Sequence, residues 1–157
     1  MPRLETVGPL RLVGLMRQQN PTLDPEGTTR GLTKQWRDFV TTWHEPTSPT
    51  DNLGVHVRMA DGATRFDYFS GTPSTLPTPY GFQELRLPAM TCAVFGYEGH
   101  VVGLRVFMQK VFAKLLPDAG LTLLPNTVDA PELIERYCAN FDVVTSSGGI
   151  EILVPVR

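Results

Sequence analysis

Few residues in this chain have the type and spacing that chemistry requires. The histidines His44, His56 and His100 lie far apart and lack the short spacing typical of metal ligands, so we expect no metal site. The sequence has no glycine-rich phosphate loop, no nucleophile elbow and no cysteine–histidine arrangement. We therefore expect no cofactor. The remaining candidates for a functional site are carboxylates and aromatic rings.

One glutamate lies beside an aromatic residue on a predicted strand. Glu135 and Tyr137 are two positions apart, so both side chains point to the same face of a strand expected over 133–141. Two interpretations stay open: Glu135 faces solvent or pairs with an arginine, or it lies in a pocket. Glu151 lies on the last predicted strand, 150–156, and there we favour exposure to solvent.

Two predicted helices, 32–44 and 99–116, each carry a stripe of large apolar side chains at helical spacing. Such stripes usually belong to the core of a protein. Where two helices lie side by side on a sheet, residues at the edge of the stripe can also form the wall of a groove. The stripes contain Trp36, Phe39 and Trp43 in the first helix, and Phe107, Met108 and Phe112 in the second.

The order of the predicted elements repeats once along the chain. A strand over 8–17, a loop over 18–31, the first helix and a hairpin make one β-α-β-β half, about 8–72, in which 53–57 and 64–70 flank an Asp61-Gly62 turn. A proline-rich link, 73–81, leads to a second half, about 82–157. That half begins with a long strand over 82–97, bulged at Pro88.

These halves predict one α+β domain, 1–157, with pseudo-two-fold symmetry. The sheet should be mostly antiparallel, with the two main helices on one face and a groove between them.

Composition excludes several classes of protein. The 157 residues carry 14 basic and 16 acidic side chains, a net charge of −2 without a basic patch, so direct binding of nucleic acid is not expected. Cys92 and Cys138 lie in apolar surroundings and should be buried, reduced thiols. The chain lacks the pattern of a signal peptide and any apolar run near the ~20 residues that span a bilayer. We expect a cytoplasmic protein that does not enter the membrane.

Several short segments, in order, resemble the GyrI-like effector-binding domain family, the ligand-sensing module that occurs alone or fused to MerR- and AraC-type regulators. The resemblance runs from about Arg11 to Val156. Two positions differ from the family pattern: Met90 replaces a usual glycine, and Leu153 replaces a frequent aromatic residue. The matching segments are Arg11–Leu15, Trp36–Phe39, Phe66–Gly71, Leu87–Phe95, Leu116–Gly120, Ile134–Tyr137 and Glu151–Val156.

The resemblance implies a ligand site with a glutamate at its floor. Glu135 would take that role, with Tyr137, Trp36, Tyr68, Phe107 and Leu153 around it. A buried carboxylate without a counter-charge is costly, and a bound cation relieves that cost, while aromatic faces add about 0.5–2 kcal/mol of cation–π attraction. The expected ligand is therefore a hydrophobic, cationic small molecule, with a regulator protein as a further partner.

Two alternatives also follow from the resemblance. In one, the chain hydrolyses strained cyclopropane-type alkylating compounds, with Glu135 as general base and Tyr137 or Tyr68 as proton donor. In the other, it inhibits DNA gyrase by protein–protein contact. Stand-alone binding of a small molecule ranks first, and we favour a protein that is not an enzyme.

Overall fold

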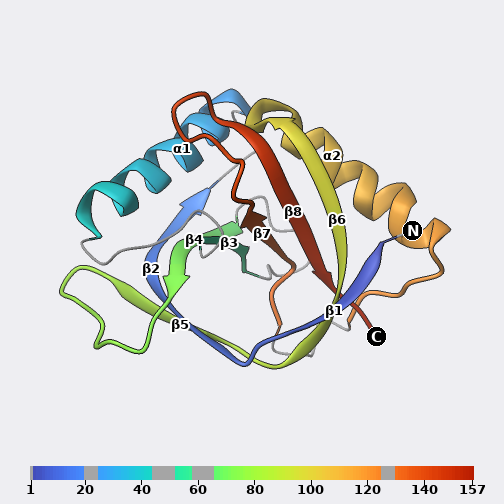
Figure 1. The fold of residues 1–157 in the computed structure, drawn as a ribbon, viewed down its shortest axis with the longest axis horizontal. Coiled ribbons are helices and arrows are strands. Elements are labelled where there is room, and N and C mark those ends of the chain that lie inside the picture. The colour runs from blue at the N-terminus through green and yellow to red at the C-terminus, as the bar shows by residue number, and fades with distance from the viewer. Residues whose placement is uncertain (1, 20–24, 44–51, 58–65, 125–129) are drawn as a thin grey trace.

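The computed structural model describes residues 2–19, 25–43, 52–57, 66–124 and 130–157, with the backbone alone at 25–30 (Figure 1). Eight strands form one antiparallel sheet in the order β1-β6-β8-β7-β3-β4-β2-β5. The strands are β1 (Arg3–Val7), β2 (Leu10–Gln19), β3 (Leu53–His56), β4 (Phe66–Pro73), β5 (Gln83–Leu87), β6 (Met90–His100), β7 (Leu133–Tyr137) and β8 (Ser147–Pro155). The helical segments are α1 (Pro25–Thr42), η2 (Val101–Gly103), α2 (Leu104–Lys110), the π-helical η3 (Val111–Leu115) and α3 (Leu116–Asp118).

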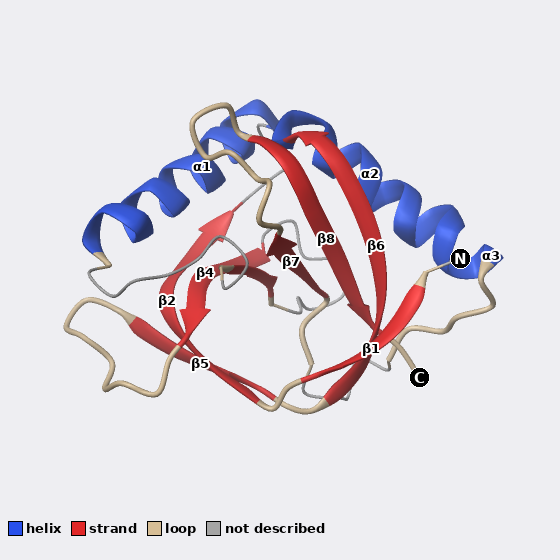
Figure 2. Cartoon of the chain, in the orientation of Figure 1, coloured by secondary structure: helices blue, strands red, loops and turns tan. Residues whose placement is uncertain are grey.

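The sheet is curled into a half-barrel, and the two main helices lie along one side of it (Figure 2). Helix α1 and the continuous helical stretch that contains α2 diverge from each other across that side (Figure 1). Within the described ranges, no helix has the length and apolar content needed to cross a lipid bilayer. The α+β class, the antiparallel sheet and the two β-α-β-β halves predicted from the sequence are confirmed.

Each half begins with a bent strand rather than a straight one. β1 and β2 are separated at Gly8-Pro9, and β5 and β6 at Pro88-Ala89; the pieces then pair β1 with β6 and β2 with β5. Proline cannot donate a hydrogen bond to the sheet, so each strand breaks there. Gly8 has φ +84°, and a Cβ there would overlap the carbonyl oxygen of Pro88. A side chain at residue 8 would therefore push the crossing strands apart.

The two faces of the sheet bury different sets of residues. On the face that carries the helices, buried strand residues such as Phe95, Ile150 and Ile152 pack with Leu104 and Val111 of the second helical stretch. On the concave face, residues such as Val55, Phe69, Ile134 and Leu153 form a separate cluster. This separation follows from strand alternation, because neighbouring residues point to opposite faces.

The structure corrects several predicted boundaries. The first helix begins at Pro25, whereas the sequence prediction assigned 18–31 to a loop, and β2 continues to Gln19. Strand β1 was not predicted, β6 extends to His100, and β7 ends at Tyr137 instead of residue 141. The link after residue 73 is a loop as predicted, and it leads to β5 at Gln83. His44 and the predicted Asp61-Gly62 turn lie outside the described residues.

Candidate functional site

A buried carboxylate lies near the middle of the helix-covered face of the sheet. Oε1 of Glu135 accepts hydrogen bonds from the hydroxyls of Tyr68 (2.7 Å) and Tyr137 (2.9 Å). Its other oxygen, Oε2, lies 2.6 Å from Nε2 of His56. The carboxylate is therefore held by two tyrosines and one imidazole from three strands. We call Glu135, Tyr68, Tyr137 and His56 the Glu135 cluster.

The strand register explains why these side chains meet. Glu135 on β7 lies opposite Gly54 on β3, and His56 on β3 lies opposite Tyr68 on β4. Opposite residues share a face, as do residues two apart on one strand, so all four side chains of the cluster point toward the helices.

Gly54 makes room for the cluster. A Cβ at this position would overlap the Tyr68 hydroxyl and lie 2.9 Å from Oε1 of Glu135. The Tyr68 side chain therefore extends from β4 across β3, directly above the Gly54 backbone, and its hydroxyl reaches Glu135 on β7. A side chain larger than hydrogen at residue 54 is incompatible with this hydrogen bond.

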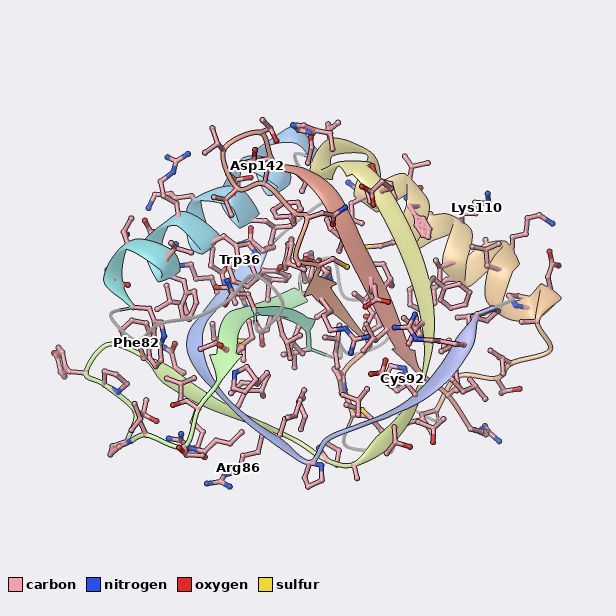
Figure 3. The ribbon with its side chains drawn as sticks, viewed as in Figure 1. Trp36, Phe82, Arg86, Cys92, Lys110 and Asp142 are labelled. Carbon is pink, nitrogen blue, oxygen red and sulfur yellow. The ribbon has the colours of Figure 1, made fainter. Side chains whose placement is uncertain are left out.

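Helix α1 extends the network from above. Nε1 of Trp36 donates to the Tyr68 hydroxyl (2.9 Å), and the Trp36 ring meets the Tyr137 ring edge-to-face with centroids 5.2 Å apart. Figure 3 shows Trp36 between α1 and the sheet. The adjacent Gln35 is fully buried and donates to the backbone oxygens of Leu15 and Tyr68. These bonds attach α1 to β2 and β4 at the position of the cluster.

Aromatic rings continue on both sides of the cluster. The His56 ring stacks on Phe66, with centroids 5.0 Å apart and planes 9° from parallel. The Phe141 ring packs against the Tyr137 ring, with centroids 4.8 Å apart. The carboxylate is thus surrounded by rings whose faces and edges can interact with an apolar or cationic partner.

The protonation of the tyrosines follows from this environment. Burial, followed by the charge of Glu135, raises the pKa of both Tyr68 and Tyr137 well above the ordinary tyrosine value. Both hydroxyls therefore keep their protons at neutral pH and act as donors to Glu135. Tyr68 also accepts from Trp36, so the donors are aligned Trp36 to Tyr68 to Glu135.

The structure brings four of the six predicted site residues together: Glu135, Tyr137, Tyr68 and Trp36. The other two, Phe107 and Leu153, lie elsewhere. Leu153 is buried in the cluster on the concave face, because it lies opposite Ile134 and not opposite Glu135. Phe107 projects from α2, and its ring packs beside the Tyr97 ring with centroids 5.3 Å apart.

Three other polar or thiol residues from the sequence analysis are also placed. His100 accepts a hydrogen bond from the backbone N–H of Val102. Glu151 is not a free surface residue, since it pairs with Arg3 (2.6 Å) and Arg136 (2.9 Å). Both cysteines are free thiols; Cys92 is buried and Cys138 only half-buried.

A groove of about 450 Å³ lies beside the second helical stretch, next to β6. Phe107 is part of its wall, so the ring predicted to line the glutamate site faces this groove. Lys110 and Asp118 add one charge of each sign. The groove is lined by Pro2, Val94, Phe95, Gly96, Phe107, Lys110, Leu115, Asp118 and Ala119.

Comparison with known proteins identifies relatives of this chain. The sequence model of the GyrI-like small molecule binding domain matches residues 1–157. None of the curated proteins matches the chain in sequence. Among solved structures, SAV2435 bound to tetraphenylphosphonium is similar with a TM-score of 0.72 and 17% identity, over 100% of this chain and 94% of the other.

Two further structures share the fold. An integron cassette protein from the mobile metagenome of Vibrio cholerae gives a TM-score of 0.68 at 13% identity, covering 99% of this chain and 95% of its own. The C-terminal domain of EcmrR, a protein also solved in complex with DNA, gives a TM-score of 0.62 at 14% identity, covering 100% of this chain and 97% of its own. At these identities the likeness establishes a common fold.

Proposed function

The chain belongs to the GyrI-like small molecule binding domain family, and on that premise we propose that it binds a hydrophobic, cationic small molecule at Glu135. The observation that carries the proposal is the buried carboxylate itself. Among the described residues, its partners are two hydroxyls and an imidazole, and neither hydroxyl carries a positive charge. A cation that enters this environment gains the attraction of the carboxylate in a medium that screens charge weakly.

The rings around the carboxylate fit such a ligand. Trp36 and Tyr137 meet edge-to-face beside Oε1, and Phe66 and His56 are stacked beside Oε2. Aromatic side chains bind apolar groups through burial of surface and attract cations through their faces. SAV2435, which shares the fold, has been solved with tetraphenylphosphonium, a permanent cation covered by phenyl rings. This compound is therefore the natural first probe for this chain.

The direct test is the binding of tetraphenylphosphonium by the wild-type protein and by Glu135→Gln, measured by isothermal titration calorimetry. Glutamine keeps the size and the acceptor oxygen but removes the charge, so we expect the affinity to fall about 10- to 100-fold, or about 1.4–2.7 kcal/mol. Glu151→Gln is the matched control, because Glu151 lies on the neighbouring strand and pairs with Arg3 and Arg136. Equal affinity of the Glu135→Gln and wild-type proteins would refute the assigned role of Glu135.

The hydrolase alternative uses the same residues, and we rank it second. A tyrosine that donates a proton to a substrate works best when its pKa is close to the working pH. Here burial and the charge of Glu135 raise the pKa of Tyr68 and of Tyr137, which opposes donation of the proton from either hydroxyl to a substrate. Turnover of a strained cyclopropane compound by the wild-type protein, absent in Glu135→Gln, would reverse this ranking.

Inhibition of gyrase ranks last, and recovery of gyrase subunits in a pull-down would support it.

We also propose a partner and a compartment for this function. EcmrR carries a domain of the same fold in a protein that was solved on DNA, so a regulator is the kind of protein that could respond to the ligand-bound state. The cytoplasm is the proposed compartment, supported by the two free cysteines, since reducing conditions there keep thiols unpaired.

A further inference from the structure

We propose that His56 is a proton-dependent competitor for the ligand, built into the site at Oε2 of Glu135, which sets how strongly the site prefers cations. The inference rests on the proposed binding function and adds its regulation. The two carboxylate oxygens of Glu135 have different partners: both tyrosine hydroxyls are bound to Oε1, while Oε2 lies 2.6 Å from Nε2 of His56. Any cation that approaches Oε2 therefore meets His56.

The burial of the two side chains points the same way. The Glu135 side chain is 3% exposed and the His56 side chain 13%, so the imidazole reaches solvent where the carboxylate does not. His56 is thus the more exposed partner of the pair, in contact with Oε2. Its ring is held on Phe66 by stacking, which fixes the direction of Nε2 toward Glu135.

The groups that face His56 define what its titration can do. From β7 the titratable group is Glu135, and from β4 the neighbours are Tyr68 and the apolar Phe66. Glu132 approaches through its backbone, whose N–H donates to the oxygen of His56. The tyrosines stay neutral near pH 7 because their pKa values are raised. Among the described neighbours, Glu135 is therefore the charge that responds to the protonation of His56.

Two charge states of the pair then compete for the ligand. A neutral imidazole that donates from Nε2 leaves the pair with one negative charge, which favours a bound cation. A protonated imidazole makes the pair neutral, and the ligand must then displace a cation that is already in place. Cation binding is thus coupled to release of a proton, and affinity should fall as the pH is lowered, by up to about tenfold per pH unit. A neutral aromatic ligand has no such coupling.

The test measures tetraphenylphosphonium binding between pH 5.5 and 8.5, because this cation does not titrate. For the wild-type protein we expect affinity to fall at least about tenfold from the upper to the lower pH. His56→Gln can keep the hydrogen bond to Oε2 but cannot take up a proton, so its affinity should change less than about twofold over the same range. His100→Gln is the matched control, since His100 caps η2 away from the cluster, and it should retain the wild-type pH profile.

The outcomes separate the two claims. If the wild-type protein binds tetraphenylphosphonium and His56→Gln keeps the full pH profile, the role of His56 is overturned while the binding function stands. If the wild-type protein fails to bind at any pH in the range, the binding function fails, and the competitor role with it. A second measurement needs no variant: titrations near pH 6.5 in buffers of different ionisation enthalpy should show net proton release by the wild-type protein. Proton uptake, or none, would contradict the proposal.

Discussion

The two helices of this protein contact the same sheet in different ways. Under α1, the contact is polar at its centre: Trp36 and Gln35 donate hydrogen bonds to Tyr68, which in turn donates to Glu135. Under the second helical stretch, Leu104, Val111 and Leu116 pack on apolar residues such as Phe95 and Ile152. The repeated architecture therefore holds a charged cluster under α1, where β3 of the first half pairs with β7 of the second, and an ordinary hydrophobic core under the second helical stretch.

The edges of the two contacts differ as well. Phe82 precedes β5 and places its ring against Phe39 (6.3 Å) and Trp43 (5.5 Å) of α1 (Figure 3). Pro2 holds the corresponding place before β1, where the groove beside the second helical stretch lies open. The comparison teaches that the fold supplies two similar helix–sheet contacts and that a few residues decide what each one does. The helix–sheet contact under α1, which holds the carboxylate, has its edge sealed by aromatic rings.

The largest difference between the two helix–sheet contacts is expected when the space beside the Glu135 cluster is filled. Gly54→Ala would place a methyl group onto the Tyr68 hydroxyl and within 2.9 Å of Oε1 of Glu135. We expect the free energy of unfolding to fall by about 2–3 kcal/mol and tetraphenylphosphonium binding to be lost. Gly96→Ala on β6 is the control, because a Cβ there meets nothing within 4 Å, and its stability should stay within about 0.5 kcal/mol of wild type. Urea denaturation of both variants measures the difference.

A smaller change removes one donor from the carboxylate. Tyr137→Phe leaves the ring against Trp36 but deletes the hydroxyl at 2.9 Å from Oε1. Loss of a hydrogen bond to a buried charged group should lower the free energy of unfolding by about 1–2 kcal/mol. Tyr97→Phe, beside the second helical stretch, deletes a hydroxyl that donates to the exposed backbone oxygen of His100, and it should cost clearly less. Equal losses would mean that the cluster adds nothing special to stability.

Binding distinguishes the two aromatic residues that the sequence placed in one site. Trp36→Phe removes the indole donor to Tyr68 and part of the ring beside Tyr137, so we expect tetraphenylphosphonium affinity to fall about three- to tenfold, or about 0.7–1.4 kcal/mol. Phe107→Leu alters the wall of the groove next to β6 and should leave that affinity unchanged. Fluorescence titration of both variants provides the comparison. A larger effect at Phe107 would place the ligand in the groove beside the second helical stretch instead.

The smallest expected effect concerns the concave face. Arg136 pairs with Glu5 and holds the pKa of that carboxyl below its ordinary value of 4.5. The folded pKa is therefore lower than the unfolded one, so this stabilisation is present above about pH 4.5 and is lost as the pH falls through the folded pKa. The pair is partly exposed to solvent, which limits its contribution to about 0–1 kcal/mol. Glu5→Gln should make melting temperature less steeply dependent on pH between about 5 and 3, with little change in ligand affinity.

Much of the fold was predictable because it follows from local patterns. Alternation and helical spacing gave the β-α-β-β order of both halves and placed Glu135 and Tyr137 on one face. The start of α1 was predicted wrongly because Pro25 and the following glycine and threonines resemble a loop, although proline is well tolerated in the first turn of a helix. Strand β1 is short and largely exposed, so its pairing with β6 leaves little pattern in the sequence.

The site was predictable only in part, because it is assembled by pairing between the halves. His56 lies 79 positions from Glu135 in the sequence, and the two meet only because β3 pairs with β7. The alternation over 53–57 placed His56 on the same face as Gly54, but nothing local indicated which strand would lie beside it. Leu153 was placed in the site by family resemblance, whereas its register opposite Ile134 turns it to the other face. Register between distant strands is the information that a single sequence lacks.

The central claim is that Glu135 makes this site prefer positive charge, and one pair of ligands tests it directly. Tetraphenylphosphonium and tetraphenylborate have nearly the same size and shape and opposite charges, so calorimetric titration of the wild-type protein with both at pH 8 isolates the contribution of charge. The account predicts that the cation binds at least about 100-fold more tightly, a difference of about 2.7 kcal/mol, and that Glu135→Gln removes most of this preference. Equal affinity of the wild-type protein for the two ions would contradict it.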